Sequence, residues 1–160
     1  MTEDNNKAAI VVFSGDLDKA FAALTIATGC TAAGMDTTLF FTFWGLNVIK
    51  KGTPTQAQSF LGKMMGMMNR GGINRLNPSR FSFGGIGRVL FSKMMRDKKV
   101  ASLEELLQTL VDLDVHLLAC KMSMDVLEVS RDDLIPEVED VVGVASFVNE
   151  AANSKIQLFI

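Results

Sequence analysis

Residues 7–43 read KAAIVVFSGDLDKAFAALTIATGCTAAGMDTTLFFTF, and this stretch decides the fold class. Residues 7–13 form a continuous apolar run, which is typical of a parallel strand covered on both faces. Apolar residues at helical spacing follow from Leu17, with Asp16 as the candidate N-cap. Residues 36–43 are rich in aromatic and β-branched side chains and predict a second strand. Strand, helix and strand in this order predict a βαβ unit.

The helix predicted over residues 17–33 has apolar residues on two opposite faces. The two stripes consist of Leu17, Ala20, Phe21, Leu24 and Thr28, and of Ala23, Ile26, Cys30 and Ala33. A helix that is apolar on both sides is normally buried on both sides. We therefore expect one stripe to pack on the sheet and the other to lie in a covered layer or at a subunit interface.

Segment 51–99 interrupts this alternation with a composition of its own. It contains ten lysine or arginine residues and a single acidic residue, so it carries +9, whereas the rest of the chain carries −11. Six of the ten methionines also lie in this segment. Apolar residues at helical spacing predict one helix from Phe60 to Met68 and a second over residues 87–97, with a glycine-rich loop between them.

Regular alternation resumes after residue 100, where the capping box SLEE at 102–105 opens a helix. The remaining predicted elements are a short helix over 44–50, a strand over 115–119, a short helix from 123 to 127, a cap at 130–133, a helix around 144–151 and a strand over 156–160. Together these elements predict a small α/β sandwich with a parallel sheet. We expect a single domain over residues 1–160, with a basic, methionine-rich helical insertion at about 51–99.

The composition limits the classes of protein to which the chain can belong. With 160 residues, 48% of them apolar, it can bury a core and is too apolar for intrinsic disorder. Two cysteines and one histidine exclude a disulfide scaffold, a cysteine-rich zinc module and a histidine-rich metal site. We therefore expect no metal site. No signal peptide or membrane-spanning run is visible, so we expect a reduced, cytoplasmic protein.

Cys120 is the sharpest candidate for chemistry, because it follows the predicted third strand at the edge where open α/β sheets collect ligands. A helix that starts two or three residues later directs free N–H groups at the sulfur, and Lys121 adds positive charge. Both effects favour the thiolate, so Lys121, Met122 and Ser123 are the candidate stabilising residues. Asp125 would oppose them if it faced the sulfur. The alternative is a buried structural cysteine.

The other two residues with reactive chemistry are weaker candidates. His116 precedes Cys120 by four residues on the strand, which separates them by about 13 Å at ~3.3 Å per residue. We therefore interpret His116 as a core or ligand-lining residue rather than a catalytic base. Cys30 lies within an alanine-rich helix, where packing is the expected role. A disulfide between Cys30 and Cys120 is not expected in a reducing compartment.

The loop after the first strand contains Ser14, Gly15 and Asp16, at the position where doubly wound folds bind phosphate. It has neither G-x-G-x-x-G nor a P-loop motif, and its acidic residues would repel a phosphate. A helix-capping loop is therefore favoured over a nucleotide or flavin site. These three residues and Trp44 are candidate pocket-lining residues.

Segment 51–99 allows three interpretations. Methionine-rich basic helices can bind a partner or an anionic membrane surface, and their charge can attract anionic substrates such as oxidised sulfur species. In the third, which we favour for most of the methionines, the segment is a flap that packs on the domain or on a sister subunit. Nucleic acid is not expected, because the charge is combined with methionines rather than with stacking aromatic residues.

Four blocks of the sequence resemble the DsrE/DsrF-like sulfur-relay family, in particular its DsrE-type branch that is also labelled a peroxiredoxin family. They are AAIVVFSGDLDKAFAALTIATG (8–29), DTTLFFTFWGLNVIKK (36–51), VHLLACKMSMDVLEVSRDDLI (115–135) and GVASF (143–147). The chain departs from the family pattern at Val142, where a glycine is expected. The resemblance implies a Rossmann-like or flavodoxin-like three-layer sandwich with a mostly parallel sheet, assembled into a homo-oligomer.

The resemblance also implies a function. Members of the family carry sulfur as a persulfide on a cysteine and pass it to acceptor proteins, a role that maps onto Cys120. The leading hypothesis is a sulfur carrier or sulfurtransferase whose partners are sulfur donor and acceptor proteins or small sulfane-sulfur compounds. This chemistry requires no metal and no organic cofactor. The alternative is a non-catalytic adaptor that docks on a membrane or an acidic partner through residues 51–99.

Overall fold

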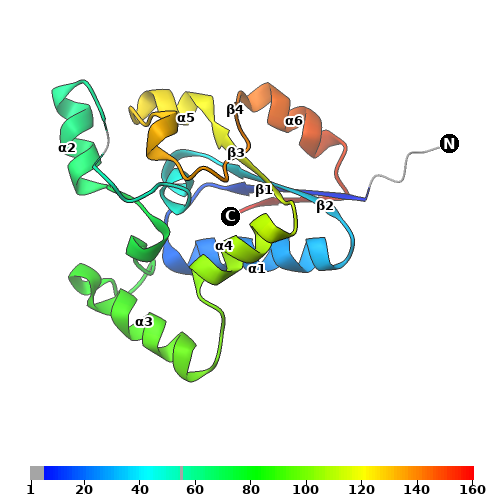
Figure 1. Ribbon diagram of the computed structural model, residues 1–160, viewed down its shortest axis with the longest axis horizontal. Helices are drawn as coiled ribbons and strands as arrows, with labels where there is room; N and C mark the ends of the chain where they lie inside the picture. Colours follow the sequence, from blue (N-terminus) through cyan, green and yellow to red (C-terminus); the bar gives the residue numbers. More distant parts are fainter. Residues whose placement is uncertain (1–5, 55) are drawn as a thin grey trace.

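The computed structural model describes residues 6–54 and 56–160, and within these ranges the strands form one parallel sheet (Figure 1). Its strands are β1 (Lys7–Val12), β2 (Asp36–Phe41), β3 (His116–Cys120), β4 (Asp140–Val142) and β5 (Ile156–Phe159). They lie in the order β4-β3-β2-β1-β5. Each neighbouring pair is parallel, so the carboxyl ends of all strands meet at one edge of the sheet.

Helices cover both faces of this sheet. The body of the fold contains α1 (Leu17–Ala32), α4 (Leu103–Asp112), α5 (Lys121–Val126) and α6 (Val144–Ala152). In Figure 1, α1 and α4 lie below the sheet, and α5 and α6 lie above it. This arrangement of helix, sheet and helix confirms the predicted three-layer α/β sandwich, including the βαβ unit formed by β1, α1 and β2.

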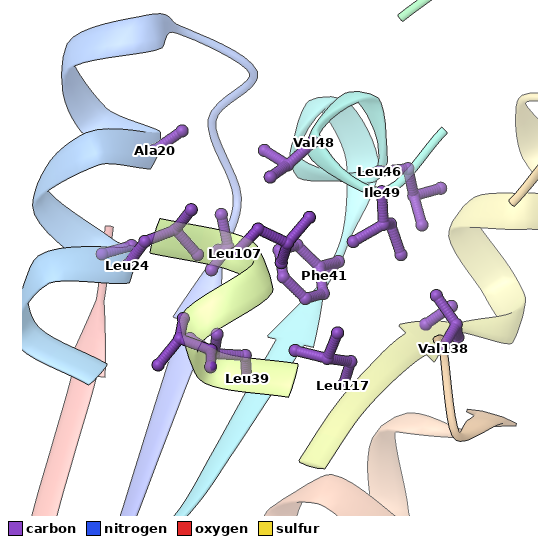
Figure 2. Close-up of a cluster of buried hydrophobic side chains, with 14 of the residues drawn as sticks. Ala20, Leu24, Leu39, Phe41, Leu46, Val48, Ile49, Leu107, Leu117 and Val138 are labelled. Carbon is purple, nitrogen blue, oxygen red and sulfur yellow. The ribbon is translucent and has the colours of Figure 1, made fainter. Parts of the chain in front are cut away.

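The larger apolar core lies between the sheet and the pair α1 and α4. Figure 2 shows Leu39, Phe41 and Leu117 of the sheet together with Leu24 of α1 and Leu107 of α4, all of them buried. Full burial of one such side chain stabilises the fold by about 1.5–3 kcal/mol. Because successive strand residues point to opposite faces, a second and smaller cluster forms beneath α6. It consists of Ala9, Phe40, Cys120 and Phe147.

The second apolar stripe of α1 is only partly covered within the chain. Ala23 and Cys30 are buried as expected, whereas Ile26 is 38% exposed and Ala33 is also exposed. The layer beside α1 is α4, which contacts it but has 10 residues against the 16 of α1. The covered layer predicted for the second stripe is therefore present only in part, because α4 is shorter than α1, and a subunit interface over the rest of the stripe stays a prediction.

Several boundaries at the carboxyl edge also differ from the prediction. The third strand ends at Cys120 rather than at residue 119, and α5 begins at Lys121 rather than near Ser123. The helix predicted over 44–50 is a 3₁₀ helix, η1 (Phe43–Val48). Strand β4 has no counterpart among the predicted elements, because three residues carry no periodic pattern and pairing with β3 creates the strand.

Segment 51–99 contains the two expected helices, α2 (Phe60–Met68) and α3 (Ile86–Asp97), which project from one end of the sandwich (Figure 1). Of the two surfaces on which we expect most methionines of this segment to pack, the domain does not cover them, and packing on a sister subunit stays a prediction. The exposed ones are Met64, Met67, Met68 and Met94. The two short helices extend beyond the sheet, so their apolar faces lack a surface of the same chain to cover them. Among the described residues, no helix is both long and apolar enough to cross a membrane.

A single carboxylate fixes the start of α2. Glu128 accepts hydrogen bonds from the backbone N–H groups of Gln58 and Ser59, each at 3.0 Å, and from the Ser59 hydroxyl. These bonds, led by that of the Ser59 hydroxyl, hold the pKa of Glu128 below its ordinary value. The Ser59 hydroxyl in turn accepts from the Gly62 N–H and caps the helix. Glu128 therefore attaches the insertion to the body of the fold.

We expect Glu128→Gln to release α2 without unfolding the body, because the amide has one acceptor oxygen where the carboxylate has two. Trypsin should then cut after Lys51 or Lys63 several-fold faster than in the unchanged protein at neutral pH. Because the folded pKa of Glu128 is depressed, the wild-type attachment persists at neutral pH and weakens only as the pH falls through that value. The exposed Glu137→Gln is the matched control, and equal cleavage rates in the two variants would contradict this role.

Candidate functional site

Cys120 is placed by three neighbouring strands. It is the last residue of β3 and pairs in register with Val142 of β4, while Ala119 pairs with Phe41 at the end of β2. Helix α5 begins at the next residue, so Cys120 occupies the N-cap position of that helix. Cys120 therefore lies at the carboxyl edge of the sheet and directly before a helix, and no loop separates β3 from α5.

The thiol is covered, contrary to a simple picture of an open sulfur at the sheet edge. Cys120 is 0% exposed and belongs to the cluster with Phe40 and Phe147. The rings of Phe40 and Phe147 stack with centroids 4.5 Å apart. Val142 packs against this cluster from β4. The cover of the sulfur is thus made by an edge strand and by α6.

Polar groups nevertheless lower the pKa of the Cys120 thiol below its ordinary value. Burial acts against this and raises the pKa, and it is the largest single influence. The hydroxyl and backbone N–H of Ser123, the hydroxyl of Thr42 and the backbone N–H of Met122 outweigh it by stabilising the thiolate. Ser123 and Thr42 are themselves buried, with their hydroxyl oxygens 2.8 Å apart. The site is a buried sulfur among hydrogen-bond donors.

The three predicted stabilising residues act in different ways. Ser123 contributes through both its side chain and its backbone, and Met122 contributes through its N–H while its side chain is exposed. Lys121 instead pairs with Asp125 on the solvent-exposed side of α5, so the pair lies in water rather than against the sulfur. The carboxylate of Asp125, which would oppose a thiolate if it faced the sulfur, is neutralised by this ion pair with Lys121.

Sequence reasoning missed Thr42. This residue directly follows β2, the strand that lies beside β3, so it reaches the same edge of the sheet as Cys120. The signal that could have found it is a hydroxyl residue at the end of the neighbouring strand. This signal could not assign Thr42 to the site, because a single sequence does not show that β2 lies beside β3.

The predicted pocket-lining residues form a separate site. Ser14, Gly15, Asp16 and Trp44 all line one open cavity of about 870 Å³ near the ends of β1 and β2. Cys120 does not line it. The structure therefore brings these four residues together as expected, but it does not join them to the thiol.

Within the loop that lines this cavity, Asp16 has a different role from the predicted side-chain cap. It occupies the N-cap position of α1 but makes no side-chain capping bond. Its carboxylate accepts from the Ser14 hydroxyl at 3.0 Å and pairs with Lys19 at 2.9 Å. The negative charge of this loop is thus locally compensated.

His116 lies at the opposite end of β3 from Cys120. Its Nδ1 is 2.6 Å from Glu139 and its Nε2 is 3.2 Å from Asp36. The hydrogen bond with Glu139 is the main reason that the pKa of His116 is raised. The residue is a surface ion-pair partner that also lines a small cavity, and it is not a base for Cys120, as the strand spacing predicted.

The environment of the second cysteine, Cys30, is that of a residue packed in a helix. Cys30 is buried in α1, and burial raises the pKa of its thiol. Both cysteines are free. Across residues 6–54 and 56–160, no three histidine, cysteine, aspartate or glutamate residues are grouped so that they could hold a metal ion.

The fold and this site define a class of small, parallel α/β sandwich proteins with a polarised cysteine at the end of the third strand. Residues 4–159 match the model of the DsrE/DsrF/DrsH-like family, and the chain belongs to that family. The resemblance inferred from the four sequence blocks is therefore confirmed.

Two curated relatives match over almost the whole chain. The chain is 36% identical to the uncharacterized protein YrkE of Bacillus subtilis, with 100% of both proteins covered. It is 31% identical to the sulfur carrier protein DsrE2 of Allochromatium vinosum, with 98% of this chain and 99% of that protein covered. The family and this relative support a role in sulfur relay.

Solved structures agree on the fold. The ychN protein from E. coli and MTH1491, a protein of unknown function from Methanobacterium thermoautotrophicum, each superimpose with a TM-score of 0.57. Sequence identities are 14% and 13%, and each match covers 96% of this chain and 98% of the other. At this identity the likeness extends to the fold alone.

We expect Ser123→Ala to raise the pKa of Cys120, because it removes a hydroxyl that stabilises the thiolate while leaving the backbone N–H in place. A hydrogen bond to a charged group is worth about 1.5–3 kcal/mol, so alkylation near neutral pH should slow by about tenfold or more. The measurement is the pH dependence of iodoacetamide labelling in a Cys30→Ser background. Ser92→Ala on α3 is the control, and unchanged pH profiles in both variants would remove Ser123 from the site.

Proposed function

We propose that this protein carries sulfane sulfur as a persulfide on Cys120 and transfers it to an acceptor thiol. The observation that supports the proposal most directly is the polarised environment of Cys120, in which hydroxyl and N–H donors favour the thiolate despite complete burial. Membership of the DsrE/DsrF/DrsH-like family and the similarity to a sulfur carrier protein support the same conclusion.

The chemistry consists of two thiol exchange steps. The Cys120 thiolate attacks the outer sulfur of a donor persulfide, the donor S–S bond breaks, and the donor sulfur leaves as a thiolate that takes up a proton. An acceptor thiolate then attacks the outer sulfur of the Cys120 persulfide, and Cys120 leaves as a thiolate. Sulfane sulfur moves without net oxidation or reduction, so the cycle requires no external electron carrier.

The same donors assist both steps. Ser123, Thr42 and the Met122 N–H stabilise negative charge on the Cys120 sulfur when it attacks and again when it leaves. A lowered pKa increases the thiolate fraction, and it also makes the sulfur a better leaving group in the second step. Cys30 has none of these groups, and its raised pKa makes it the poorer nucleophile.

Access to the sulfur requires its cover to move. β4 has three residues and pairs only with β3 in the described sheet, so few backbone bonds hold it. Short edge elements open locally at a small fraction of the free energy of global unfolding. We propose that displacement of β4 and the start of α6 admits the donor and acceptor, and that at other times the aromatic cover shields the persulfide from water and adventitious thiols.

Intact mass spectrometry after treatment with polysulfide tests the carrier role. The protein should gain the mass of one sulfur atom, and dithiothreitol should remove it. Cys120→Ser should abolish the gain, because it removes the nucleophile, whereas Cys30→Ser should retain it. A gain that follows Cys30 would relocate the site, and the absence of any gain under conditions that label free thiols would overturn the proposed function.

We expect Phe147→Ala to accelerate the reaction of Cys120, because it removes one ring of the cover. Iodoacetamide labelling in a Cys30→Ser background should become several-fold faster at constant pH. Leu107→Ala, which truncates the opposite core at a typical cost of about 2–5 kcal/mol, is the matched control for general destabilisation. Equal acceleration in the two variants would show that the thiol reacts through global unfolding and not through local opening.

A further inference from the structure

The cavity of about 870 Å³ has no part in the proposed sulfur chemistry, because Cys120 does not line it. It lies where β1 and β2 end, and residues of segment 67–77 of the insertion line it together with Arg88. In parallel α/β sheets this edge is where ligands bind. The side chains in the walls of this cavity therefore determine which ligand it can bind.

Hydrogen bonds hold the outer rim in place. The N–H of Leu17, the first residue of α1, donates to the Asn77 carbonyl at 2.8 Å. The Asn47 carbonyl accepts from the Gly72 N–H at 2.8 Å, and the Asn47 side-chain amide donates to Asn69 at 2.8 Å. The insertion is thus tied across both strand ends, so the cavity exists before any ligand arrives.

Close backbone packing supports the same conclusion. A Cβ on Gly15 would lie 2.6 Å from the Trp44 carbonyl oxygen. A Cβ on Gly71 would lie 2.8 Å from Asn47 Oδ1, and Gly71 also has a φ of +66° that disfavours side chains. The loop after β1 and the rim therefore both pack directly against residues of η1, Trp44 and Asn47.

Most of the charged side chains that line the cavity are positive. Lys19 forms an ion pair with Asp16. This pair neutralises the carboxylate that was expected to repel an anion at this loop. Among the described residues, no carboxylate forms an ion pair with Arg70, Arg75 or Arg88, all of which line the cavity. Arg88 is oriented by a hydrogen bond of 3.1 Å from Nη1 to the Arg75 carbonyl.

The cavity also has large apolar side chains in its wall, beside polar ones such as Asn47, Asn69 and Asn77. Phe13 and Trp44 line the cavity from the ends of the strands, and Met67 and Met68 line it from the end of α2. All four are exposed although they are large apolar side chains. A cavity of this size matches an organic molecule, since ligand pockets of about 300–1,000 Å³ are typical, and a single inorganic oxyanion would leave most of it filled with water.

We propose that this cavity binds an amphipathic organic anion, with an oxyanion group such as a phosphate held by Arg75 and Arg88 and an apolar or aromatic body against Trp44 and the methionines. Guanidinium groups bind oxyanions in two-pronged geometry, and methionine adapts to different apolar shapes. The inference concerns a second site and does not depend on persulfide formation at Cys120.

The test uses 1-naphthyl phosphate as the probe, with inorganic phosphate and 1-naphthol as its two halves. Trp44 is the only tryptophan in the sequence, so its single indole N–H resonance in an NMR spectrum reports on the cavity wall. We expect 1-naphthyl phosphate to shift this resonance and, by calorimetry, to bind at least about tenfold more tightly than either half, as about 1.4 kcal/mol of added contact would give. Binding of inorganic phosphate with equal affinity, or no shift of the Trp44 resonance, would overturn the proposal.

Variants separate the cavity from general charge. Arg75→Gln with Arg88→Gln should weaken 1-naphthyl phosphate about tenfold or more, because each removes a charge-assisted hydrogen bond. Lys93→Gln with Lys98→Gln removes equal charge from exposed positions outside the cavity and should leave the affinity unchanged. Equal weakening in both pairs would overturn the proposal.

Two further measurements make the outcome unambiguous. If the arginine pair misfolds, Trp44→Leu serves as the second variant and should weaken the probe by calorimetry without changing the net charge. Persulfide formation on Cys120, measured by intact mass, should be retained in the Arg75→Gln and Arg88→Gln variants. Failure of the anion site and failure of the proposed sulfur chemistry are therefore observed separately.

Discussion

The site depends on the parallel pairing of β3 between β2 and β4. This pairing brings Thr42, Cys120 and Val142 to one edge of the sheet although they come from distant parts of the chain. It also starts α5 directly after Cys120, which places the N–H groups of Met122 and Ser123 around the sulfur. Without this register, the cysteine would be one more small apolar side chain in a core.

The sulfur is subject to two opposing influences. Burial disfavours a thiolate, and the surrounding hydroxyl and N–H dipoles favour it more strongly, so the pKa is lowered at a fully buried sulfur. A fixed set of dipoles needs no reorganisation when charge appears, which is an advantage for a group that must alternate between nucleophile and leaving group. The same burial has a cost, because the partners of the proposed transfer can reach Cys120 only when its cover opens.

The insertion gives the fold a second chemical surface. Its rim residues are fastened to the strand ends by backbone and amide hydrogen bonds, while its helices carry basic and uncovered apolar side chains outward. The charge of +9 in segment 51–99 is therefore not simply a solvated face, since three of its arginines converge on the cavity next to the loop after β1. The body and the insertion thus present different chemistries at the same end of the molecule.

Local patterns in the sequence determined the parallel sandwich, the helices of the insertion, the family, and the position of Cys120 at a strand end ahead of a helix, because periodicity, capping residues and motifs are properties of neighbouring residues. Only the tertiary structure decided that Thr42 bonds to Ser123 and that Lys121 pairs with Asp125. It also decided that Phe147 and Val142 pack around Cys120, and that arginines of the insertion line the same cavity as the loop at Ser14. The three-residue strand β4 belongs to this second group. Each of these contacts depends on strand order and on how distant segments pack, which no local pattern records.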